Sequence, residues 1–329
     1  MMPLLTPLTD IADALRTAKK IAIAAHVRPD GDAVGSVMGL ALSLTAMGKT
    51  VYALLEDGVP NNLAFLPETI TILTPPYADF ELDVAVALDT ASHERFGVNT
   101  VAVFACASLL IDIDHHPTNP GYGQLNHIDG AQPAVGQIVY ELLRAGDFPM
   151  PDPVRQHLFT AISTDTGSFQ YSSTTARTHQ IVAEMISEGL DTARLSQLLY
   201  QTYPARRLIL MRAMLNEMNY RAEGRIASWN LTEALMDEAH TQAGDTEGLI
   251  DTLRMIDTVM CAVIFEELPG GKIRVSARSK DSRLDVSAVC AQFGGGGHRL
   301  AAGARMKGPI VQAAETYLNA LEHEVRRIA

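Results

Sequence analysis

Histidine and aspartate side chains follow the ends of apolar segments in this chain. The stretch "IAIAAHVRPDGDAVGS" (residues 21–36) passes from five apolar residues directly to His26, Asp30 and Asp32. Asp89 ends a second apolar segment, "VAVALD". Taken singly, an Asp after a strand is usually a turn residue or a helix cap. The repetition of carboxylates and imidazoles at segment ends points instead to a binding or catalytic site.

A third group of such residues ends the segment "LLIDIDHH". It holds Asp112, Asp114, His115 and His116, and a further carboxylate, Asp165, follows the helical segment "VRQHLFTAIST". Asp112 and Asp114 share strand parity, so at least one of them could simply face solvent. Five or more carboxylates and histidines on one rim would repel one another unless a cation lay among them. We infer a metal centre.

The donor types narrow the choice of metal. Carboxylate oxygens and imidazoles without thiolates suit Mn²⁺ or Mg²⁺ better than structural zinc. Carboxylates can also bridge, so these side chains could hold two ions about 3.5 to 4 Å apart, which suits in-line displacement at phosphorus. A bridging hydroxide would be the nucleophile, and the chemistry indicated is phosphoester hydrolysis. Four other histidines have no such setting and are interpreted as surface or packing residues: His93, His127, His157 and His179.

These side chains need a scaffold that brings them to one place. In the first half of the chain, short apolar segments alternate with helical ones, which predicts an α/β fold with a parallel sheet flanked by helices. The carboxyl ends of parallel strands meet at one edge, where such sheets bind ligands. Gly35 and Ser36 fit the opening of the helix after the first strand, whose N-terminus favours anions. We expect strands over 21–25, 51–55, 84–88 and 109–113, and helices over 33–47, 135–144, 154–162 and 175–187.

The second half of the chain has a different pattern. Residues 191–217 are helical in composition, with an interruption at Pro204, and predict a connector. "GRIASWNL" predicts a strand, "MCAVIFEELPGGKIRVSARSK" a hairpin, and residues 310–326 a closing helix. We therefore expect a metal-binding catalytic domain over 1–190, a helical connector over 191–217 and a smaller α+β domain with a mixed sheet over 218–329.

Composition limits the classes of protein that fit. With 329 residues, the chain exceeds the size at which one core usually keeps growing. Its formal charge of −12 argues against a broad basic surface for long duplex nucleic acid. The N-terminus lacks a signal-peptide pattern, and the longest apolar run, 101–111, is too short to span a membrane. Three separate cysteines without a CxxC pair fit a reducing compartment, so we expect a cytoplasmic protein.

Six motifs in order resemble the DHH phosphoesterase superfamily. "HVRPDGDAVGS", "VALDTAS", "DHH" and "STDTGSFQYSST" are similar to its four successive motifs. "KIRVSARSK" and "DVSAVCAQFGGGGHRLAAG" resemble its DHH-associated C-terminal domain. The resemblance covers nearly the whole chain and extends to the NrnA-type oligoribonucleases, which also cleave 3′-phosphoadenosine 5′-phosphate (pAp).

The resemblance implies a role for each matched residue. One ion, Mn²⁺ or alternatively Mg²⁺, would be bound by His26, Asp30 and Asp89, and a second by Asp32, Asp89, His115 and Asp165. His116 would contact the scissile phosphate and assist the leaving oxygen. Asp114 would support a histidine from behind, where a carboxylate fixes the imidazole tautomer.

The glycine run "GGGGH" (residues 294–298) matches no phosphate-loop pattern, because no Gly-Lys-Ser or Gly-Lys-Thr follows. Alone it is typical of a flexible turn, although glycines also let a ligand approach backbone N–H groups. Arg278 and Lys280 share one face of the preceding strand, which is equally typical of a solvated face. The resemblance implies that Arg278 and His298, with Lys280, Gly296 and Gly297 beside them, hold a substrate phosphate across an interdomain cleft. Such a cleft would select very short chains.

One segment departs from the family pattern. "GAQPAVGQIVYELL" carries Gln132, Pro133 and Gln137 where the family usually shows small residues ending in Glu. None of them is an implied metal ligand, so the departure concerns the shape of the site and its substrate preference. RecJ-type exonucleases share the core motifs but are longer and carry an OB-fold domain. Family II pyrophosphatases have a different, Lys- and Arg-rich C-terminal signature.

The leading hypothesis is a manganese-dependent phosphodiesterase that hydrolyses short oligoribonucleotides (nanoRNA) to mononucleotides and also dephosphorylates pAp. One alternative is hydrolysis of cyclic dinucleotides or of their linear product pApA. An alternative of another class is a non-catalytic, nucleotide-binding regulatory protein. The intact ligand set counts against it, because a lapsed enzyme has no chemical reason to retain every acidic ligand. A homodimer formed through the N-terminal domain is implied by the resemblance alone.

Overall fold

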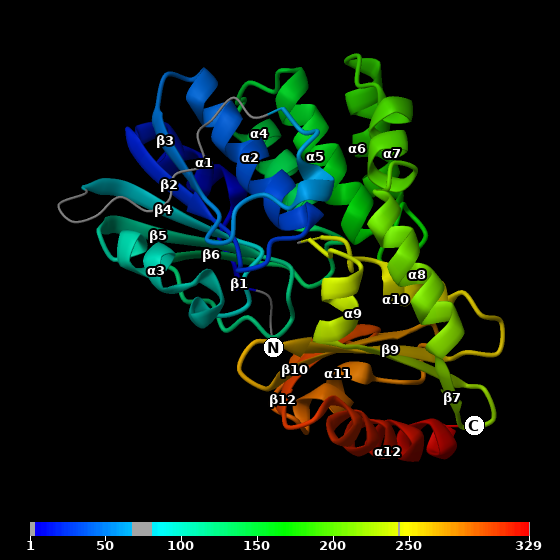
Figure 1. Cartoon of the computed structure of the whole chain (residues 1–329). Helices are drawn as coiled ribbons and strands as arrows, with labels where there is room; N and C mark the ends of the chain where they lie inside the picture. Colours follow the sequence, from blue (N-terminus) through cyan, green and yellow to red (C-terminus); the bar gives the residue numbers. More distant parts are fainter. Residues whose placement is uncertain (1–3, 68–80, 243, 329) are drawn as a thin grey trace. The chain divides into compact units, whose positions relative to one another are not determined.

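The computed structural model describes residues 4–67, 81–242 and 244–328. The chain divides into two compact units, Met1–Thr202 and Tyr203–Ala329, each built on its own sheet (Figure 1). The boundary falls between α7 (Thr192–Tyr200) and α8 (Ala205–Glu217), the two helices of the expected 191–217 connector. In the described part of the chain, no helix has both the length and the hydrophobicity needed to cross a membrane.

The first unit contains a six-stranded sheet in the order β1-β6-β5-β4-β2-β3. Strands β2 to β6 pair in parallel, and the short β1 is antiparallel to β6. The predicted parallel sheet and its four strands are confirmed, with ends that shift by one or two residues, whereas β1 and β6 were not predicted. The strands are β1 (Leu4–Leu5), β2 (Lys20–Ala24), β3 (Thr50–Leu54), β4 (Leu82–Leu88), β5 (Ala107–Asp114) and β6 (Leu125–Ile128).

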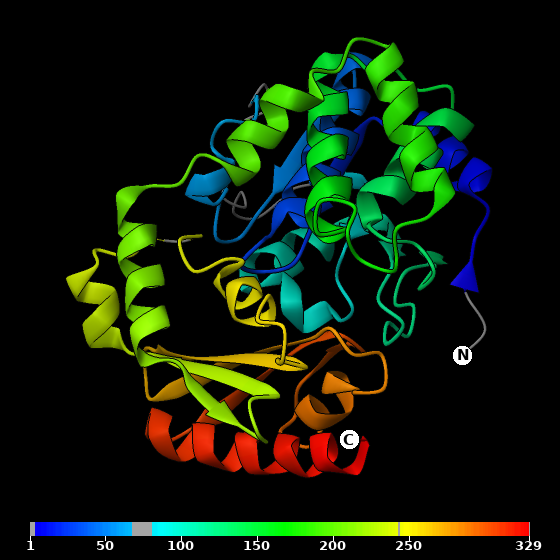
Figure 2. The same cartoon turned by 90° about the vertical axis from the view of Figure 1, so that its right-hand side faces the viewer.

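Helices cover both faces of this sheet (Figures 1 and 2). On β2, Ile21 and Ile23 pack into the large core with α1, α2, α4 and α5, while Ala22 and Ala24 pack on the side of α3. Helices α6 and α7 pack outside α4 and α5. The helices are α1 (Leu8–Thr17), α2 (Gly31–Ala46), α3 (Val98–Phe104), α4 (Val135–Ala145), α5 (Asp152–Asp165) and α6 (Ala176–Ser187), with 3₁₀ turns η1 (Asn61–Leu63) and η2 (His93–Phe96).

Helix α2 begins earlier than the sequence predicted. Asp30 caps it, because its carboxylate accepts hydrogen bonds from the N–H groups of Asp32 (3.1 Å) and Ala33 (3.0 Å). Gly35 and Ser36 therefore lie inside the helix, and their assignment to its opening was wrong. The strand-to-helix connection is short, so the residues that carry carboxylates stay close to the end of β2.

Two glycines of α2 explain how closely this helix packs against α5. A Cβ at Gly35 would lie 2.4 Å from the carbonyl oxygen of His157, and one at Gly31 would lie 2.4 Å from Oγ1 of Thr164. Both distances are far below normal contact, so only glycine permits this helix spacing. The spacing brings the start of α2 beside the end of α5, where Asp165 lies.

The second unit contains a six-stranded mixed sheet in the order β11-β12-β10-β9-β8-β7. Only β8 and β9 pair in parallel among its neighbours. Helices α11 and α12 pack on one face, and α8 and α10 on the other (Figure 2). The predicted strand, hairpin and closing helix are confirmed. The elements are β7 (Asn219–Arg221), β8 (Ile226–Leu231), β9 (Cys261–Leu268), β10 (Lys272–Ser279), β11 (Gly296–His298), β12 (Ala301–Lys307), α9 (Glu233–Glu238), α10 (Leu249–Arg254), α11 (Val286–Ala291) and α12 (Ile310–Ile328).

Candidate metal centre

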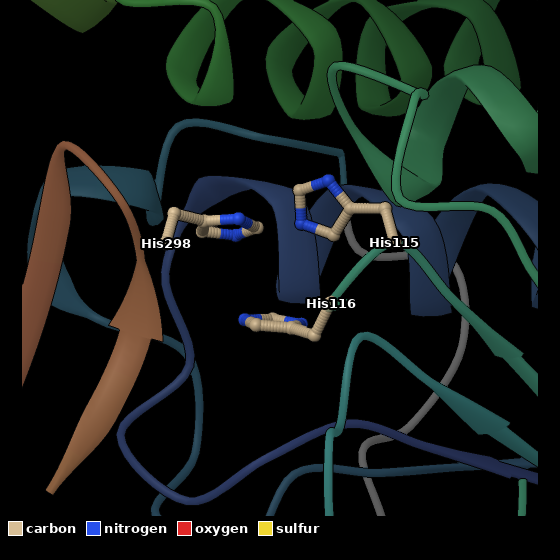
Figure 3. Close-up of side chains that lie close together, drawn as sticks. All are labelled: His115, His116 and His298. Atoms are coloured by element: carbon tan, nitrogen blue, oxygen red, sulfur yellow. The ribbon is translucent and has the colours of Figure 1, made fainter. Parts of the chain in front are cut away.

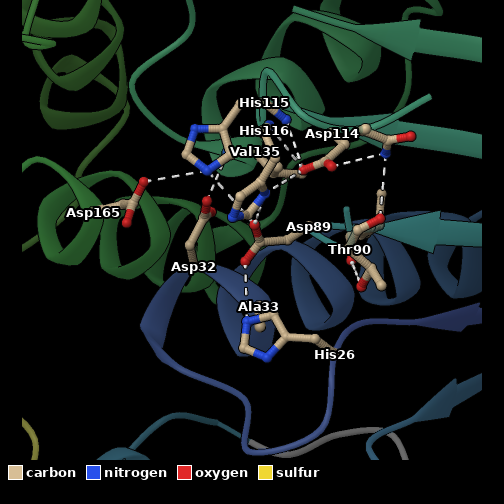
Figure 4. A network of polar contacts seen from close by, with 12 residues as sticks. His26, Asp32, Ala33, Asp89, Thr90, Asp114, His115, His116, Val135 and Asp165 are labelled. Carbon is tan, nitrogen blue, oxygen red and sulfur yellow. Dashed lines mark hydrogen bonds and ion pairs between the residues drawn. The ribbon is translucent and has the colours of Figure 1, made fainter. Parts of the chain in front are cut away.

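Asp89 lies at the middle of the polar cluster on the carboxyl edge of the first sheet (Figure 4). It follows β4 directly and is 2% exposed. Its Oδ2 is 3.5 Å from Nε2 of His26, and its Oδ1 is 3.6 Å from Nε2 of His115. The backbone of Asp89 has a φ of 52°, a left-handed conformation that Asp tolerates better than most residues. Its Oδ1 also lies 3.6 Å from Nδ1 of His116, so one carboxylate faces three imidazoles.

His26 and His115 are held in the same way. Nδ1 of His26 is 2.9 Å from the carbonyl oxygen of Val27, and Nδ1 of His115 is 3.2 Å from that of Gln132. A carbonyl oxygen can only accept, so Nδ1 is the protonated nitrogen in each ring when the imidazole is neutral. In both rings Nε2 therefore points toward the carboxylates, as metal-binding histidines require.

Asp30 and Asp32 enter the cluster from the first turn of α2. The second oxygen of Asp30, Oδ2, is 3.8 Å from Nε2 of His26. The carboxylate of Asp32 accepts from the N–H groups of Val135 (2.7 Å) and Gly136 (2.8 Å) at the start of α4. These two hydrogen bonds from the N-terminus of α4 fix the orientation of the Asp32 side chain.

Asp165 is the last residue of α5, not a residue beyond it as the sequence suggested. Its Oδ2 is 3.5 Å from Nε2 of His115. The predicted helix ended at residue 162, and the longer helix carries the carboxylate to the cluster on a rigid element. Asp165 therefore joins the group of residues that the sequence placed in the metal centre.

Asp114 contacts both histidines of the DHH segment from behind. Its Oδ1 accepts from the N–H groups of His115 (2.8 Å) and His116 (3.2 Å) and lies 2.8 Å from Nδ1 of His116. The His115 and His116 rings meet edge to face, with centroids 5.0 Å apart (Figure 3). Asp114 accepts from every one of these groups, so it fixes the orientation of the His116 ring.

Asp112 is also completely buried, like Asp114. The expectation that one of the two faces solvent was wrong, because the turn that follows β5 covers both. Asn119 Nδ2 lies 3.3 Å from Oδ1 of Asp112, and the N–H of Tyr122 lies 3.3 Å from its Oδ2. Burial and the charge of Asp114 raise the pKa of Asp112 to about 7. Sequence reasoning missed Asn119 and Tyr122, since a polar residue in a turn carries no periodic signal.

Burial and neighbouring charges shift the pKa values of the cluster's carboxyl groups in different directions. Burial raises the pKa of Asp32 well above its usual range, and the nearby charges of Asp89 and Asp165 raise it further. Burial likewise raises the pKa of Asp165 to about 6. For Asp89 burial acts in the same direction, but hydrogen bonds with His115 and His26 hold its pKa well below its usual range. Asp32, Asp89 and Asp165 therefore all depend on nearby positive charge to remain ionised.

The pKa values of two imidazoles in the cluster, His26 and His115, are raised. Burial lowers the pKa of His26, but its hydrogen bond to Asp89 and the charge of Asp30 more than offset this and raise the value to about 9. The pKa of His115 is also raised, by Asp89 and Asp165, against the effect of burial. A divalent cation would replace these imidazole protons and stabilise the ionised acids, so the electrostatics of the cluster fit a metal ion.

Among the described residues of the first unit, donor atoms form three groups close enough to hold a metal. They are His26, Asp30 and Asp89; Asp32, Asp89 and His115; and Asp89, Asp114 and His116, each with its donor atoms within 4.8 Å of one another. Asp89 belongs to all three. Oxygen and imidazole donors suit Mn²⁺ or Mg²⁺, and a shared carboxylate is the usual bridge of a two-ion site.

The expected substrate-binding residues all lie in the second unit. Arg278 lies on β10, half-buried, opposite Ala262 and Ala301. Lys280 lies beyond the end of that strand, and its ammonium donates to the carbonyl oxygens of Ile256 and Asp257. The expectation that the two side chains share a strand face was therefore wrong, because β10 ends at Ser279.

Most of the glycine run has a structural explanation. Gly296, Gly297 and His298 form β11, which pairs with β12, rather than a flexible turn. A Cβ would lie 2.1 Å from the carbonyl oxygen of Gly303 if placed at Gly295, and 2.6 Å from that of Ala301 if placed at Gly297. At Gly294 and Gly296 a Cβ would meet no described atom within 4 Å, so these two positions face open space, although Gly294 has a left-handed φ of 72° that favours glycine. The ring of His298, drawn in Figure 3, extends from the last residue of β11.

Two family models match this chain, one in each unit. The model for the DHH family, N-terminal domain, matches residues 20–164, and the DHHA1 domain matches residues 230–327. The fold and the cluster of Asp and His side chains therefore define a protein of the DHH and DHHA1 class.

Full-length relatives narrow the class. The Bifunctional oligoribonuclease and PAP phosphatase NrnA of Thermus thermophilus is 31% identical over 319 residues, covering 96% of this chain and 94% of that protein. The Bacillus subtilis protein of the same name is 28% identical, with 90% and 92% covered. An exopolyphosphatase-related protein from Bacteroides fragilis has a crystal structure that superposes with a TM-score of 0.86 at 26% identity, covering 96% and 95%. The chain belongs to the DHH family, as a member of the NrnA type.

Proposed function

We propose that this chain hydrolyses short oligoribonucleotides to mononucleotides and also removes the 3′-phosphate of pAp, with two bound Mn²⁺ ions, or Mg²⁺ in their place. The single observation that carries the proposal is the position of Asp89, whose two oxygens face His26 and His115 separately. A shared carboxylate supports a two-ion site of the kind that catalyses displacement at phosphorus. The names of the full-length relatives supply the substrate class.

We assign the ligands from two of the groups of donor atoms, and add Asp165 to the second because it lies 3.5 Å from His115. His26, Asp30 and Asp89 would hold one ion, and Asp32, Asp89, His115 and Asp165 the other. When bound, two such metal ions supply an activated water and stabilise the negative charge that develops on the phosphate oxygens. The chain itself contributes rigid elements, because every ligand lies at the end of a strand or in a terminal turn of a helix.

His116 has a separate task in the proposed reaction. Asp114 holds Nδ1 of this ring, so Nε2 on the opposite side can hydrogen-bond to the scissile phosphate and pass a proton to the leaving oxygen. This step needs a proton on each ring nitrogen, and Oδ1 of Asp114 is placed to accept a hydrogen bond from the one on Nδ1. His116 therefore acts on the substrate rather than as a metal ligand.

The second unit contributes substrate binding in this proposal, through Arg278, Lys280, Gly296, Gly297 and His298. Arg278→Gln is expected to raise the KM for a diribonucleotide about tenfold while leaving kcat and Mn²⁺ affinity within twofold, because a charge-assisted phosphate contact contributes on the order of 1.5 to 3 kcal/mol. Arg326→Gln is the matched control, since Arg326 is an exposed residue of α12 paired with Glu322. An unchanged KM in Arg278→Gln would refute its role.

A panel of substrates tests the proposed function. Purified protein with Mn²⁺ or Mg²⁺ is offered diribonucleotides to pentaribonucleotides, pAp, pApA, cyclic di-AMP and pyrophosphate, with Asp89→Asn as the inactive control. Release of mononucleotides from the short RNAs and of phosphate from pAp is expected. Preference for pApA or cyclic di-AMP would instead favour a dinucleotide phosphodiesterase, and no turnover of any compound would favour a non-catalytic nucleotide-binding protein.

We also propose that the protein acts as a homodimer in the cytoplasm, through contacts of the first unit. A reducing compartment is supported by its three cysteines, none of which forms a disulfide among the described residues. Sedimentation equilibrium of the purified chain tests the dimer, and a single species at the monomer mass would contradict it.

A further inference from the structure

The carbonyl oxygen of Thr90 receives two hydrogen bonds from one turn, directly after the left-handed Asp89. Asn119 Nδ2 donates to it at 3.2 Å, and the hydroxyl of Tyr122 donates at 2.8 Å. Thr90 is completely buried, and its hydroxyl donates to the carbonyl oxygen of Leu88 across Asp89. Figure 4 shows Asp89 and Thr90 side by side at the end of the strand. The Thr90–Ala91 peptide, one residue beyond the proposed bridging ligand, is therefore held from outside the cluster.

Asn119 links this peptide to the DHH segment. Its amide orientation is unambiguous, because its oxygen accepts from the N–H of Gly121 at 2.8 Å. The same Nδ2 that reaches Thr90 donates to Oδ2 of Asp114 at 2.8 Å. Asp114 in turn fixes His116. One amide group, itself 2% exposed, thus joins the strand ends of β4 and β5.

Tyr122 is built into the core beside this contact. Its ring packs edge to face against His93 (centroids 5.7 Å apart) and Phe96 (6.1 Å). Its backbone N–H also donates to Asp112. Because packing already fixes the ring, the hydrogen bond from its hydroxyl to Thr90 costs no further side-chain entropy. None of these contacts touches a proposed metal ligand's donor atoms.

We propose that Asn119 and Tyr122 are positioning residues, which hold the Thr90–Ala91 peptide just beyond Asp89 so that the Asp89 carboxylate is aligned between His26 and His115. A left-handed backbone at Asp89 persists only where surrounding contacts impose it. The hydrogen bonds to Thr90 are two such contacts, and the N–H of Asp89 makes a third, to the carbonyl oxygen of Ile113 at 3.2 Å. The inference rests on the proposed two-ion function, but it concerns only groups of this chain.

The test compares two tyrosines that each lose a part-buried hydroxyl. Tyr122→Phe keeps the ring and removes the hydroxyl's bond to Thr90 together with its contact with Asp112. The control, Tyr140→Phe, removes a hydroxyl that donates to Glu184 on α6 (2.6 Å) and accepts from Arg144 (3.0 Å). In metal-free protein, Tyr122→Phe is expected to speed hydrogen exchange at the Asp89 N–H, with unchanged exchange elsewhere in the sheet. Its Mn²⁺ affinity, measured by titration calorimetry, is expected to fall about tenfold, within the range known for groups that orient metal ligands.

Kinetics supply a second readout. With saturating Mn²⁺, kcat for a diribonucleotide is expected to fall about tenfold in Tyr122→Phe, with KM changed less than twofold, and Tyr140→Phe should match the wild type. Asn119→Ala should lower kcat further, because it also removes the hydrogen bond to Asp114. Asn126→Ala is its control, because it removes amide bonds to Gly123 on the far side of the same turn. If Asn119→Ala unfolds, Tyr122→Phe alone decides.

The outcomes separate this inference from the proposed function. Equal exchange at Asp89 and equal Mn²⁺ affinity in Tyr122→Phe and Tyr140→Phe would overturn the positioning role. If instead the wild type cleaves none of the nucleotides but Tyr122→Phe still weakens Mn²⁺ binding, the proposed function fails and the positioning role stands.

Discussion

At the scale of single residues, the cluster is organised around one carboxylate, Asp89, that faces three imidazoles. Asp89 reaches His26 through one oxygen and His115 through the other, and both imidazoles are oriented by backbone carbonyl groups. Because those carbonyl groups belong to Val27 and Gln132, the orientation of these two rings depends on main-chain conformation. At Gln132 it does not require the glutamine side chain that departs from the family pattern.

Asp89→Asn is expected to abolish binding of two ions. Asn keeps the size of the side chain and tolerates the left-handed backbone, so the change removes mainly the negative charge and one ligand oxygen. Mn²⁺ stoichiometry is expected to fall from two ions per chain to at most one, with affinity reduced at least about 100-fold. The measurement is calorimetric titration with Mn²⁺.

The matched control for this substitution is Asp147→Asn. Asp147 also has a left-handed backbone, with a φ of 51°, but lies exposed after α4, away from the cluster. The Asp147→Asn protein should bind two ions, as the wild type does. Two ions bound to Asp89→Asn at normal affinity would contradict the bridging assignment.

The residues of the cluster were predictable because each follows a strand or ends a helix, and an open sheet gathers strand ends at one edge. What the sequence did not reveal are the contacts that hold them. Asn119 and Tyr122 lie in a turn, where no periodic pattern marks a buried residue. The burial of Asp112 was missed for the same reason, since its cover comes from that turn.

At the scale of secondary structure elements, the packing of α2 on α5 sets the distance between the carboxylates that they carry. Gly35→Ala is expected to destabilise the protein by about 1 to 3 kcal/mol, because its Cβ would push against the rigid backbone of α5 at His157. Mn²⁺ affinity should fall too, since α2 carries Asp32 and α5 carries Asp165. Urea unfolding and Mn²⁺ titration measure the two effects.

Gly39→Ala provides the comparison, four residues along the same helix. A Cβ there would lie 2.8 Å from Cδ2 of Leu158, the end of a flexible side chain that can move. A smaller loss of stability and no loss of Mn²⁺ affinity are expected. If the two variants behaved alike, close approach of the helix backbones would not be the reason for Gly35.

His157, at this helix contact, gives stability a defined pH dependence. Burial lowers its pKa to about 4, against a weaker opposing effect of its hydrogen bond to the carbonyl oxygen of Pro67. Between pH 6.5 and 4 the unfolded chain therefore binds more protons at this position than the folded chain. The contribution of neutral His157 to the free energy of unfolding is complete above pH 6.5. It decreases by up to about 3 kcal/mol as pH falls to 4.

His157→Gln removes this titration while retaining a donor for Pro67. In metal-free buffer, the free energy of unfolding from urea titrations at pH 7 and pH 5 should differ less in the variant than in the wild type. An equal pH dependence in both proteins would show that His157 is not buried in its neutral form.

The elements themselves were predictable where the pattern is long or strongly alternating. The strands β2 to β5, the hairpin β9–β10 and the helix α12 follow from such patterns. The short elements α3, β6, α9 and β11 were not predicted, because a few residues leave too little periodic signal. The start of α2 was misplaced because Asp30 can be read equally as a ligand or as a cap, and in the structure it is positioned to act as both.

At the scale of the whole molecule, the chain contains two units with separate cores. The side chains grouped around Asp89 all belong to Met1–Thr202, whereas the expected phosphate-binding residues belong to Tyr203–Ala329. The division into a catalytic and a substrate-binding part was proposed from the change in sequence pattern. The exact boundary was not, because both helices near it have the same helical composition.

Metal binding should therefore stabilise the first unit selectively. At a Mn²⁺ concentration 100 times Kd, the expected gain is about 2.7 kcal/mol for each site. The single tryptophan of the chain, Trp229, is buried in the core of the second unit, so its fluorescence reports unfolding of that unit. Mn²⁺ should raise the urea midpoint seen by circular dichroism while the fluorescence midpoint stays constant. Equal shifts in both signals would mean that the two units unfold together.

The most direct test of the proposed function is hydrolysis of a diribonucleotide by the wild-type protein and by Asp89→Asn. With Mn²⁺ present, the wild type should convert the dinucleotide fully to mononucleotides, and Asp89→Asn should be at least about 1,000-fold slower, as expected when charge stabilisation of several kcal/mol is lost. Intact dinucleotide after incubation with the wild type, or equal rates for the two proteins, would contradict a phosphodiesterase centred on Asp89.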